Sequence, residues 1–317
     1  MDFILLIIGF VLLIYGANFL VDGGAALAKK LNVPTIVIGL TIVAFGTSAP
    51  ELVVNIFASI KNNSDIVLGN ILGSNIFNIL SILGVSSLIR NLKVSKTTTL
   101  IEVPIVILSS IIIFIVANDI LIDKRAYSEI SRSDGLIVLI FFILFLAYNI
   151  FLGITRDFEL GEEIKDLKIQ KSIFYIIIGL TFLILGGRFV VNSSINIAKF
   201  FGISERVIAL TIVAIGTSLP ELITSIIASL KKATDIAIGN VLGSNIFNSL
   251  FIIGVSSVIT NVSVKPLNQY DIVVNILASI FIFIFLFTGK RHELERWEGV
   301  LFIILQIIYF ASLFLIS

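Results

Sequence analysis

Two six-residue segments place a proline and a glutamate inside strongly apolar sequence. Residues 46–51 read GTSAPE, and residues 216–221, which lie 170 positions later, read GTSLPE. A proline within a helix removes one backbone hydrogen bond and clashes with the carbonyl group four residues earlier. Lipid cannot satisfy the carbonyl groups that are freed in this way, so they must face protein, water or a cation. Each segment therefore predicts a broken helix with polar backbone groups near the middle of a membrane.

Glu51 and Glu221 are the acidic side chains of these segments. On membrane-insertion scales, one acidic residue at the bilayer centre costs roughly 2.5–3.5 kcal/mol. Ser48 and Glu51 also have the spacing of a capping box, so a kink capped by its own side chains is an alternative explanation for a single copy. Two copies, without lysines at the membrane centre to pair with them, favour carboxylates that bind a mobile cation.

A second repeated motif follows each of the first, at the same offset of 170 residues. Residues 69–78 read GNILGSNIFN, and residues 239–248 read GNVLGSNIFN. In each motif, polar residues at spacing i, i+4 and i+8 lie on one helical face. The two glycines of each motif predict that a neighbouring helix approaches closely. Asn75 and Asn245 are explained equally well as hydrogen-bonding residues between helices or as ligands. Four further residues of the motif are expected at the same membrane depth as the glutamates, which favours a role as cation ligands: Ser74, Asn78, Ser244 and Asn248.

The oxygen ligands narrow the choice of cation. Carboxylates, hydroxyls, amides and backbone carbonyls suit Ca²⁺, Na⁺ or Mg²⁺. The chain has no cysteine, and its one histidine, His292, is predicted to lie in a solvated polar loop, which argues against a zinc or copper site. Glu102, near the start of an apolar segment, is expected at the membrane interface. No bound cofactor is expected.

The composition is that of an integral membrane protein. Of 317 residues, 57% are hydrophobic and 14% are charged, and the mean hydropathy is +1.11, whereas soluble domains are roughly 45–50% apolar. A net charge of +1 gives no electrostatic case for nucleic acid as a partner. Segments of roughly 20 apolar residues can cross the bilayer as helices. Ten are predicted, over residues 3–28, 34–60, 65–89, 99–117, 134–152, 172–198, 204–230, 235–259, 270–288 and 297–315.

The ten spans predict an all-α integral membrane protein made of two inverted five-helix repeats. Residues 1–152 form the first repeat, 153–171 a linker and 172–317 the second, which crosses in the opposite sense because five is odd. Loops on the linker side hold fourteen Lys and Arg residues, against seven on the side of the termini. Because such residues favour the cytoplasmic face, the linker is predicted to be cytoplasmic and both termini extracellular, in the cell membrane.

An intramembrane enzyme and a passive cation channel are alternatives from other classes of function. Buried acids can perform acid–base chemistry, but the chain has no H-E-x-x-H motif, no Ser/His pair and no paired-aspartate motif. One site shared by two inverted repeats suits alternating access better than a continuous pore. The sequence therefore predicts a transporter that is not an enzyme, with membrane lipid and the transported ions as its partners.

The paired motifs resemble those of the sodium/calcium exchanger family, within the cation/calcium antiporter superfamily, over the whole chain. The resemblance implies that Glu51 and Glu221 bind Ca²⁺, helped by the backbone carbonyls of Thr47 and Thr217. It also implies that Asn78 and Asn248 line the centre of the site. Sodium ligands implied in the same way are Ser48, Ser218, Ser74, Ser244 and the carbonyl groups of Ala44 and Ala214.

The resemblance further implies a secondary antiporter that exchanges Na⁺ for Ca²⁺ by alternating access, with three Na⁺ for each Ca²⁺. It also implies that the first and sixth predicted spans slide against the other helices. A Ca²⁺/H⁺ exchanger, or an exchanger of another divalent cation with the same fold, is the alternative. The short linker is similar to the prokaryotic type, and a functional monomer is expected. Some relatives carry an aspartate where this chain has Asn248, which leaves two central carboxylates here.

Overall fold

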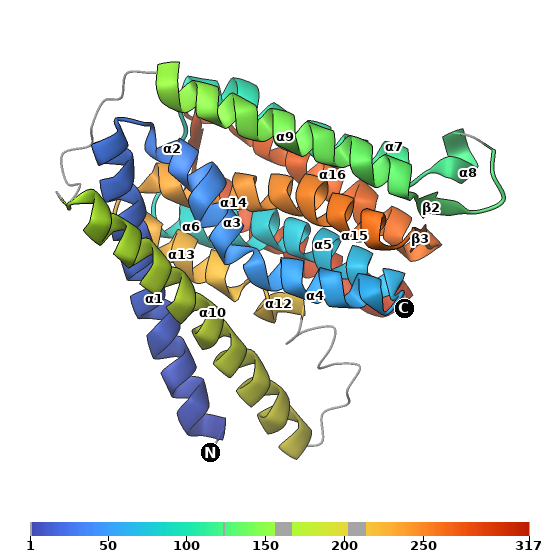
Figure 1. Cartoon of the computed structure of the whole chain (residues 1–317), viewed down its shortest axis with the longest axis horizontal. Coiled ribbons are helices and arrows are strands. Elements are labelled where there is room, and N and C mark those ends of the chain that lie inside the picture. Colours follow the sequence, from blue (N-terminus) through green and yellow to red (C-terminus); the bar gives the residue numbers. More distant parts are fainter. Residues whose placement is uncertain (1, 123, 156–166, 202–213, 317) are drawn as a thin grey trace.

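The computed structural model describes residues 2–122, 124–155, 167–201 and 214–316 as a bundle of long helices (Figure 1). Within these residues, eight helical stretches are long and apolar enough to cross a membrane, and a ninth consists of two helices that meet at a bend of 48°. Five of the eight are single helices: α1 (Asp2–Leu31), α9 (Arg132–Thr155), α10 (Ile169–Phe200), α16 (Pro266–Phe285) and α17 (Arg296–Ile316).

The other three stretches each contain a π-helical segment. They are α5 (Ser64–Phe77) with η2 (Asn78–Leu83) and α6 (Gly84–Ile89), η3 (Thr98–Glu102) with α7 (Val103–Val116), and α14 (Thr234–Ile246) with η5 (Phe247–Ile252) and α15 (Ile253–Ile259). π-Helical turns are rare, and inside α-helices they occur frequently at functional sites. Two of them contain Asn78 and Asn248, which the sequence places at the centre of the site.

The ninth stretch is broken where the first proline segment predicts a break. It runs through α2 (Thr35–Ile38), η1 (Gly39–Val43) and α3 (Ala44–Thr47), passes Ser48, and continues as α4 (Ala49–Ile60). Ser48 leaves helical geometry with φ −83° and ψ 8°. The second proline segment repeats this: Ser218, with φ −87° and ψ 7°, precedes α13 (Leu219–Leu230).

The seventh predicted span, 204–230, is only partly described. Its described part consists of α12 (Ala214–Gly216) and α13, while its first part falls among residues 202–213, outside the described residues. The predicted linker, 153–171, is flanked by helices that reach further into it, since α9 continues to Thr155 and α10 begins at Ile169. Residues 156–166 of the linker likewise lie outside the described residues.

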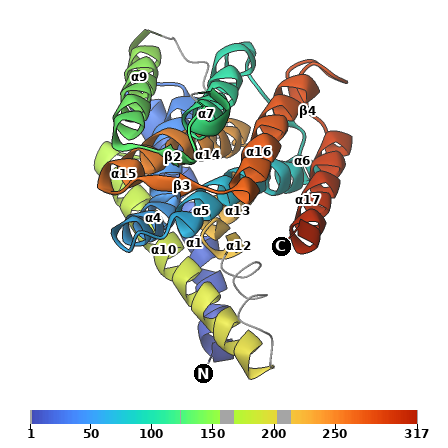
Figure 2. The ribbon, with the colours of Figure 1, turned by 90° about the vertical axis from the view of Figure 1, so that its right-hand side faces the viewer.

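Helices α1 and α10 form a close pair that projects from the bundle in both views (Figures 1 and 2). Glycines make the close approach possible, because a Cβ atom on Gly9 would lie 2.9 Å from the Gly186 carbonyl oxygen, and one on Gly16 would lie 2.8 Å from that of Gly179. Gly179 and Gly186 are the residues 170 positions after Gly9 and Gly16. The pairing of an early residue in one helix with a late residue in the other shows that the helices run antiparallel.

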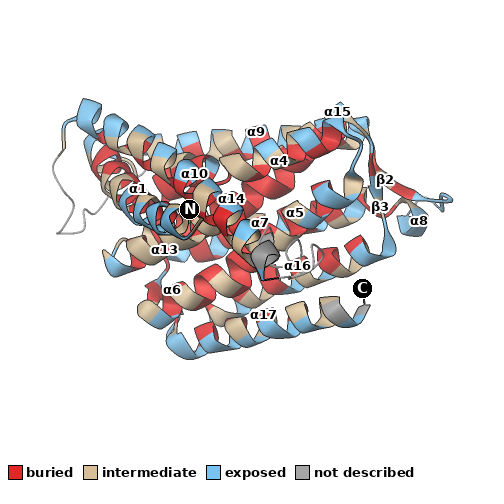
Figure 3. Cartoon of the chain, turned by 90° about the horizontal axis from the view of Figure 1, so that it is seen from below, coloured by how far each residue is buried: buried red, intermediate tan, exposed pale blue. Residues whose placement is uncertain are grey.

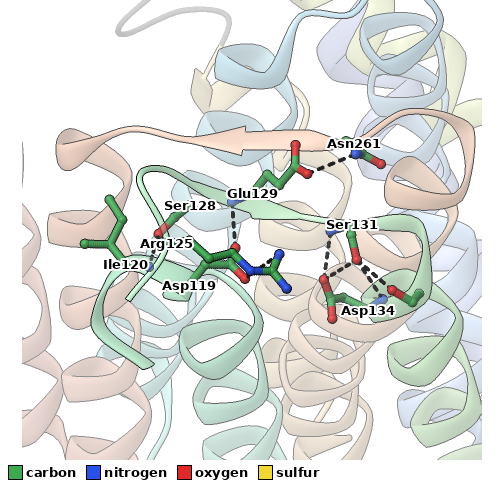
Figure 4. A network of polar contacts seen from close by, with 9 residues as sticks. Asp119, Ile120, Arg125, Ser128, Glu129, Ser131, Asp134 and Asn261 are labelled. Carbon is green, nitrogen blue, oxygen red and sulfur yellow. Dashed lines mark hydrogen bonds and ion pairs between the residues drawn. The ribbon is translucent and has the colours of Figure 1, made fainter. Parts of the chain in front are cut away.

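Two short antiparallel strand pairs join the halves of the chain at the ends of the bundle. β1 (Leu92–Lys93) pairs with β4 (Glu293–Leu294), and β2 (Ser128–Ile130) pairs with β3 (Val262–Val264). Beside β2, the Asp119 carboxylate, at the start of the short helix α8 (Asp119–Ile122), accepts a hydrogen bond from the Glu129 amide and lies 3.3 Å from Arg125 (Figure 4). Polar contacts therefore fix this end of the molecule.

The core of the bundle lies along α5 and α14. In the most apolar part of each stretch, the buried share is 94% for α14–α15 and 72% for α5–α6. The same share is only 28% for α9 and for α17. Figure 3 shows the same division, with buried residues in the middle and exposed ones along the outward faces of the peripheral helices. The two repeated Gly-Asn-Ser motifs therefore lie on the central helices, and the outer helices shield them.

Candidate cation-binding site

Ser48 connects the first proline segment to the second glutamate. Its hydroxyl donates a 2.8 Å hydrogen bond to Glu221 Oε1, although the two residues are 173 positions apart. Ser48 is the residue before α4, but its side chain makes no capping hydrogen bond to that helix. The capping-box alternative is therefore wrong: the helix does restart after Ser48, but the hydroxyl is directed to the other half of the chain.

Ser218 makes the reciprocal contact. Its Oγ lies 3.3 Å from Glu51 Oε1 and 3.1 Å from Ser74 Oγ. Glu51 is 1% exposed and Glu221 is 0% exposed, so both carboxyl groups are enclosed by protein. Each glutamate is thus held by the serine that precedes the other one, which brings the two proline segments together as the sequence predicts.

The threonines of the proline segments bind the asparagines of the second motif across the same interface. Thr47 Oγ1 donates to Asn240 Oδ1 over 2.9 Å, and Thr217 Oγ1 donates to Asn70 Oδ1 over 3.3 Å. The Asn240 side chain also donates to Ser225 Oγ and to the Glu221 carbonyl, over 2.9 and 3.2 Å. These asparagines therefore support the broken helices rather than point freely into the site.

Four asparagines form a network between the two central stretches. Asn78 donates to Asn245 Oδ1 over 3.0 Å, and Asn248 donates to Asn75 Oδ1 over 3.1 Å, which is the same contact repeated from the other half. Asn245 also donates to the Asn75 carbonyl, and Asn75 to Ser249 Oγ. Asn75 and Asn245 are thus hydrogen-bonding residues between helices, one of the two explanations that the sequence left open.

Several buried oxygen atoms of the predicted ligands have no hydrogen-bond partner among the described residues. Such atoms are rare in folded proteins. A buried acceptor that has lost its hydrogen bonds to water lowers the stability of the protein unless another group donates to it. Here they belong to both carboxylates, both central asparagines and one serine: Glu51 Oε2, Glu221 Oε2, Asn78 Oδ1, Asn248 Oδ1 and Ser244 Oγ. Carboxylate, amide and hydroxyl oxygens are the ligands of hard cations, so this donor set fits Ca²⁺ or Na⁺.

The backbone carbonyls predicted as ligands differ between the two halves. The Ala44 carbonyl accepts a hydrogen bond from the Ser48 amide, over 3.0 Å. It also lies 3.2 Å from Thr47 Oγ1, whose one proton has the closer acceptor in Asn240 Oδ1. In the second half the Ser218 amide donates instead to the Ile215 carbonyl, over 3.1 Å. Ala214 begins α12, next to residues outside the described part of the chain. In this conformation the Ser48 amide is therefore the firm donor to the Ala44 carbonyl.

Glu102 is more buried than the sequence predicts, whereas His292 lies in a turn as expected. Glu102 is 1% exposed and accepts a 2.6 Å hydrogen bond from the Tyr148 hydroxyl, so it is buried between helices and does not lie at the surface. His292 is only partly exposed, and its Nδ1 lies 3.0 Å from Thr99 Oγ1. The Glu102 prediction did not take into account Tyr148, which lies 46 residues later in the sequence.

The predicted close approach at the paired glycines can be followed for the second motif only. A Cβ atom on Gly239 would lie 2.9 Å from the Gly39 Cα, and one on Gly243 would lie 2.5 Å from the Leu40 carbonyl oxygen, so these glycines do permit the predicted close contact. For Gly69 and Gly73 no such neighbour lies within 4 Å in the described part of the chain. The corresponding partner segment in the second half begins at residue 209, which is outside it.

Two site residues were not predicted. Ser225, four residues after Glu221, accepts the Asn240 hydrogen bond, and Ser249, next to Asn248, accepts the one from Asn75. A signal for Ser225 existed in the sequence, because it lies on the same helical face as Glu221 and its counterpart 170 positions earlier, Asn55, is also polar.

The helical fold and this enclosed set of oxygen atoms are those of an ion-transporting membrane protein. A family model described as sodium/calcium exchanger protein matches residues 1–151 and 171–315. The chain belongs to the sodium/calcium exchanger family, which consists of membrane antiporters.

Similar proteins cover the chain almost completely. It is 36% identical to the inner membrane protein YrbG of Escherichia coli over 99% of this chain and 97% of the relative. It is 33% identical to the sodium/calcium exchanger MaX1 of Methanosarcina acetivorans over 99% of both. Among solved structures, the sodium-calcium exchanger NCX_Mj soaked with 10 mM Na⁺ and zero Ca²⁺ superimposes with a TM-score of 0.86, at 31% identity and 98% coverage of both chains.

Proposed function

We propose that the protein exchanges Na⁺ for Ca²⁺ by alternating access, through a single site built around Glu51 and Glu221. The observation that carries this proposal is the reciprocal pairing of each glutamate with the serine before the other one. It leaves one oxygen of each buried carboxylate without a partner among the described residues. A chain that keeps two such oxygens at its centre can use them on a cation that arrives and leaves. The names of MaX1 and NCX_Mj support sodium and calcium as these cations.

The carboxylates would bind Ca²⁺ directly. In the described residues no group of three or more histidine, cysteine, aspartate or glutamate side chains could hold a metal ion, so neutral oxygens must complete the coordination. We assign this part to the backbone carbonyls of Thr47 and Thr217, with the amide oxygens of Asn78 and Asn248 lining the centre. The free amide oxygens of these asparagines support the assignment.

Sodium would bind in the same pocket, at the serine hydroxyls and the alanine carbonyls. The ligands are Ser48, Ser74, Ser218 and Ser244, with the carbonyl groups of Ala44 and Ala214. The Ala44 carbonyl accepts the Ser48 amide and lies 3.2 Å from the Thr47 hydroxyl, whose proton has a closer acceptor in Asn240. A sodium ion at this carbonyl would therefore lie next to Thr47.

The charge of the site supports electrogenic exchange. Two ionised glutamates and one Ca²⁺ sum to zero, whereas three Na⁺ in the same pocket leave a net charge of +1. Exchange of three Na⁺ for one Ca²⁺ would then move one charge in each cycle and couple transport to voltage by about 2.3 kcal/mol per 100 mV. Asn248 adds no third carboxylate, so the balance rests on the two glutamates.

Two inverted repeats would supply the two alternating states. Contacts that recur between counterpart residues support this, among them the serine–glutamate pairs, the asparagine pairs and the antiparallel glycine contacts of α1 with α10. We assign the sliding motion to α1 and α10, the linker to the cytoplasm and both termini to the outside. Since one chain supplies every proposed ligand, a monomer would suffice for transport.

Sodium-driven uptake into proteoliposomes tests the proposal. Vesicles loaded with sodium and diluted into sodium-free buffer with radioactive calcium should accumulate calcium, and a potassium-selective ionophore that sets the membrane potential should change the rate. An imposed pH gradient should not replace the sodium gradient. Uptake that follows the pH gradient and ignores sodium would overturn the proposal in favour of a Ca²⁺/H⁺ exchanger.

Two substitutions test the site itself. Glu51→Gln and Glu221→Gln each keep the size of the side chain but remove a charge, so each should abolish uptake in a protein that still elutes as a folded species. Glu102→Gln is the matched control. Glu102 is equally buried and also has one oxygen without a partner among the described residues, but its other oxygen is bound to Tyr148 and not to a serine of the proline segments. The variant should transport normally. Transport by either site variant would refute the two-carboxylate site.

A further inference from the structure

Asp271 is a buried carboxylate that lies outside the exchange site. It belongs to α16, is 7% exposed, and its Oδ1 accepts a 2.8 Å hydrogen bond from the Tyr309 hydroxyl of α17. No lysine or arginine in the described part of the chain forms an ion pair with it. A buried charge is costly unless it is paired, so this carboxylate needs a positive charge that the described residues do not supply.

Gln306 of α17 lies on the face of that helix that packs against α16. It follows Phe302 by four residues and precedes Tyr309 by three. The Phe302 ring lies 5.0 Å from that of Phe285 of α16, measured between centroids, and Tyr309 bonds Asp271. Because residues three and four apart share one helical face, the Gln306 side chain, which is 4% exposed, also lies toward α16.

Asn275 of α16 lies at the level of Gln306. The helices α16 and α17 run antiparallel, since those two contacts join the early part of each helix to the late part of the other. Four residues forward from Asp271 lead to Asn275, and three residues back from Tyr309 lead to Gln306, so both amides lie about one turn further along the same interface. The Asn275 amide group donates to Ser110 Oγ of α7 over 3.1 Å.

The two amides keep buried atoms that have no partner. Asn275 is 1% exposed, yet its Oδ1 makes no hydrogen bond within the described structure, and neither do Oε1 and Nε2 of Gln306. Unpaired buried groups of this kind each cost stability. Together with the carboxylate of Asp271 and the hydroxyl of Tyr309, the amide oxygens form the set of neutral and charged oxygen ligands that a hard cation prefers.

The first half of the chain has no amide at the position that corresponds to Gln306. Equivalent positions on α9 and α17 follow from a repeated glycine contact. Gly135 packs against Gly254, as Gly299 packs against Gly84, so equivalent residues are 164 positions apart (299 − 135 = 164). Phe142 therefore corresponds to Gln306.

Asn275 also replaces an apolar residue of the first half. On α7 and α16, Ser110 and Ser279 each place their hydroxyl near the carbonyl four residues earlier, over 3.1 and 2.8 Å. These carbonyls belong to Val106 and Asn275, so equivalent residues are 169 positions apart here (279 − 110 = 169).

By the same offset, Glu102 corresponds to Asp271, and both are buried carboxylates bonded to a tyrosine. The repeated fold thus accepts apolar residues beside the first carboxylate, Val106 and Phe142. Only the second half carries amides there, so the helix packing alone does not account for them.

We propose that Asp271, Asn275, Gln306 and the Tyr309 hydroxyl form a second cation site, which binds one Na⁺ ion and joins α16 to α17. One carboxylate neutralises one monovalent ion, whereas Ca²⁺ in the same place would leave a buried charge of +1. Asp271 lies about one and a half turns after the start of α16 at Pro266. The site uses neither Glu51 nor Glu221, so it does not depend on the proposed exchange.

Equilibrium binding of radioactive sodium to the full chain tests the site. The purified protein is kept in detergent without calcium, and choline chloride holds the ionic strength constant. Asp271→Asn keeps an oxygen for the Tyr309 hydroxyl but removes the charge, and it should bind one Na⁺ fewer per chain at saturation. Glu102→Gln is the matched control, because that carboxylate has no amide beside it, and it should bind as many Na⁺ ions as the unmodified chain. An unchanged count for Asp271→Asn, or an equal loss in the control, would overturn the proposal.

Gln306→Leu separates a ligand from a residue that only fills space. The substitution removes an amide that has no hydrogen bond among the described residues, so without a bound ion it should raise stability and leave the effect of sodium unchanged. The proposal instead expects the affinity of this site for Na⁺ to fall about tenfold or more. Replacing choline by sodium should then raise the thermal unfolding midpoint less in Gln306→Leu than in the unmodified chain.

An equal rise of the midpoint in both proteins would show that water or a proton, and not sodium, occupies this interface. Neither measurement uses transport or calcium. Failure of sodium-driven uptake by the unmodified protein would therefore refute the proposed function and leave the second site standing, whereas normal uptake with no loss of sodium in Asp271→Asn would refute the second site alone.

Discussion

Lys231 Nζ lies 2.7 Å from Asp22 Oδ1 and joins the end of α13 to α1. Lys231 also donates a 3.2 Å hydrogen bond to the Asn18 carbonyl, and the two charged side chains are only 29% and 15% exposed. The counterparts of this pair in the other repeat are Lys61 and Asn192, which cannot form an ion pair. The contact between the proposed sliding helix and the bundle is therefore stronger on one side of the molecule than on the other.

Asp22→Asn should change the balance between the two access states. Loss of a partly screened ion pair of about 1 kcal/mol corresponds to a change of about fivefold in a two-state equilibrium. The variant should shift the ratio of apparent Ca²⁺ affinities measured from the two sides of oriented vesicles by about this factor. Lys61→Gln, which changes the counterpart lysine, should leave the ratio unchanged, and an equal shift in both variants would contradict the role of the ion pair.

Ser48→Ala should weaken the site through Glu221. The substitution removes a buried hydrogen bond to a carboxylate, an interaction worth about 1.5–3 kcal/mol, and also a proposed sodium ligand. The sodium concentration that gives half-maximal calcium uptake should rise about tenfold or more, while the protein remains folded. Ser87→Ala removes a hydroxyl that bonds only its own helix, and a comparable loss in that control would show that the effect is not specific to the site.

Asn248→Asp should make the protein less stable without cations and more dependent on them. Asn248 donates its side-chain amide hydrogen to Asn75 Oδ1, which an ionised aspartate cannot do, and the new charge lies in the same buried site as two glutamates. Loss of the hydrogen bond alone should cost about 1–3 kcal/mol of unfolding free energy.

Thermal unfolding in detergent measures this effect. Calcium should raise the midpoint of the Asn248→Asp variant by more than it raises that of the unmodified chain. An equal rise in both would place Asn248 outside the cation site.

Gly16→Ala should slow exchange by separating α1 from α10. The added methyl group would lie 2.8 Å from the Gly179 carbonyl oxygen, closer than carbon and oxygen atoms normally approach. Such overpacking costs typically about 1–3 kcal/mol and should reduce the initial rate of sodium-driven uptake. Gly24→Ala is the matched control on the same helix, because its nearest neighbour is a side-chain methyl of Ile38 at 3.3 Å, which can move. Unchanged uptake by Gly16→Ala would mean that the close contact is not needed for motion.

The chemistry of the site could be predicted from local sequence. Pro50 and Pro220 predict the broken helices because proline cannot donate a backbone hydrogen bond, and the breaks occur at Ser48 and Ser218. Glu51 and Glu221 predict a cation site because carboxylates are costly in lipid. Both kinds of inference use properties that a residue keeps in any fold of this class.

The partners of these residues could not be predicted in the same way. The spacing of Ser48 and Glu51 suggested a contact within one helix, but Ser48 bonds Glu221 instead. Glu102 was expected near the surface and is buried against Tyr148. Such contacts depend on how helices more than 40 residues apart in sequence pack together, which local spacing does not encode.

The sequence by itself determined that this chain is a duplicated membrane protein of ten expected spans with two oxygen-rich segments at matching depth, because apolar length and repeated motifs are properties of the chain. Only the tertiary structure decided which oxygens are left free. An oxygen that accepts a hydrogen bond from another helix is less available to a cation. The amide oxygens of Asn240 and Asn75 are used in this way, whereas Asn78 and Asn248 each keep an amide oxygen without a partner among the described residues. That outcome depends on packing between the two halves.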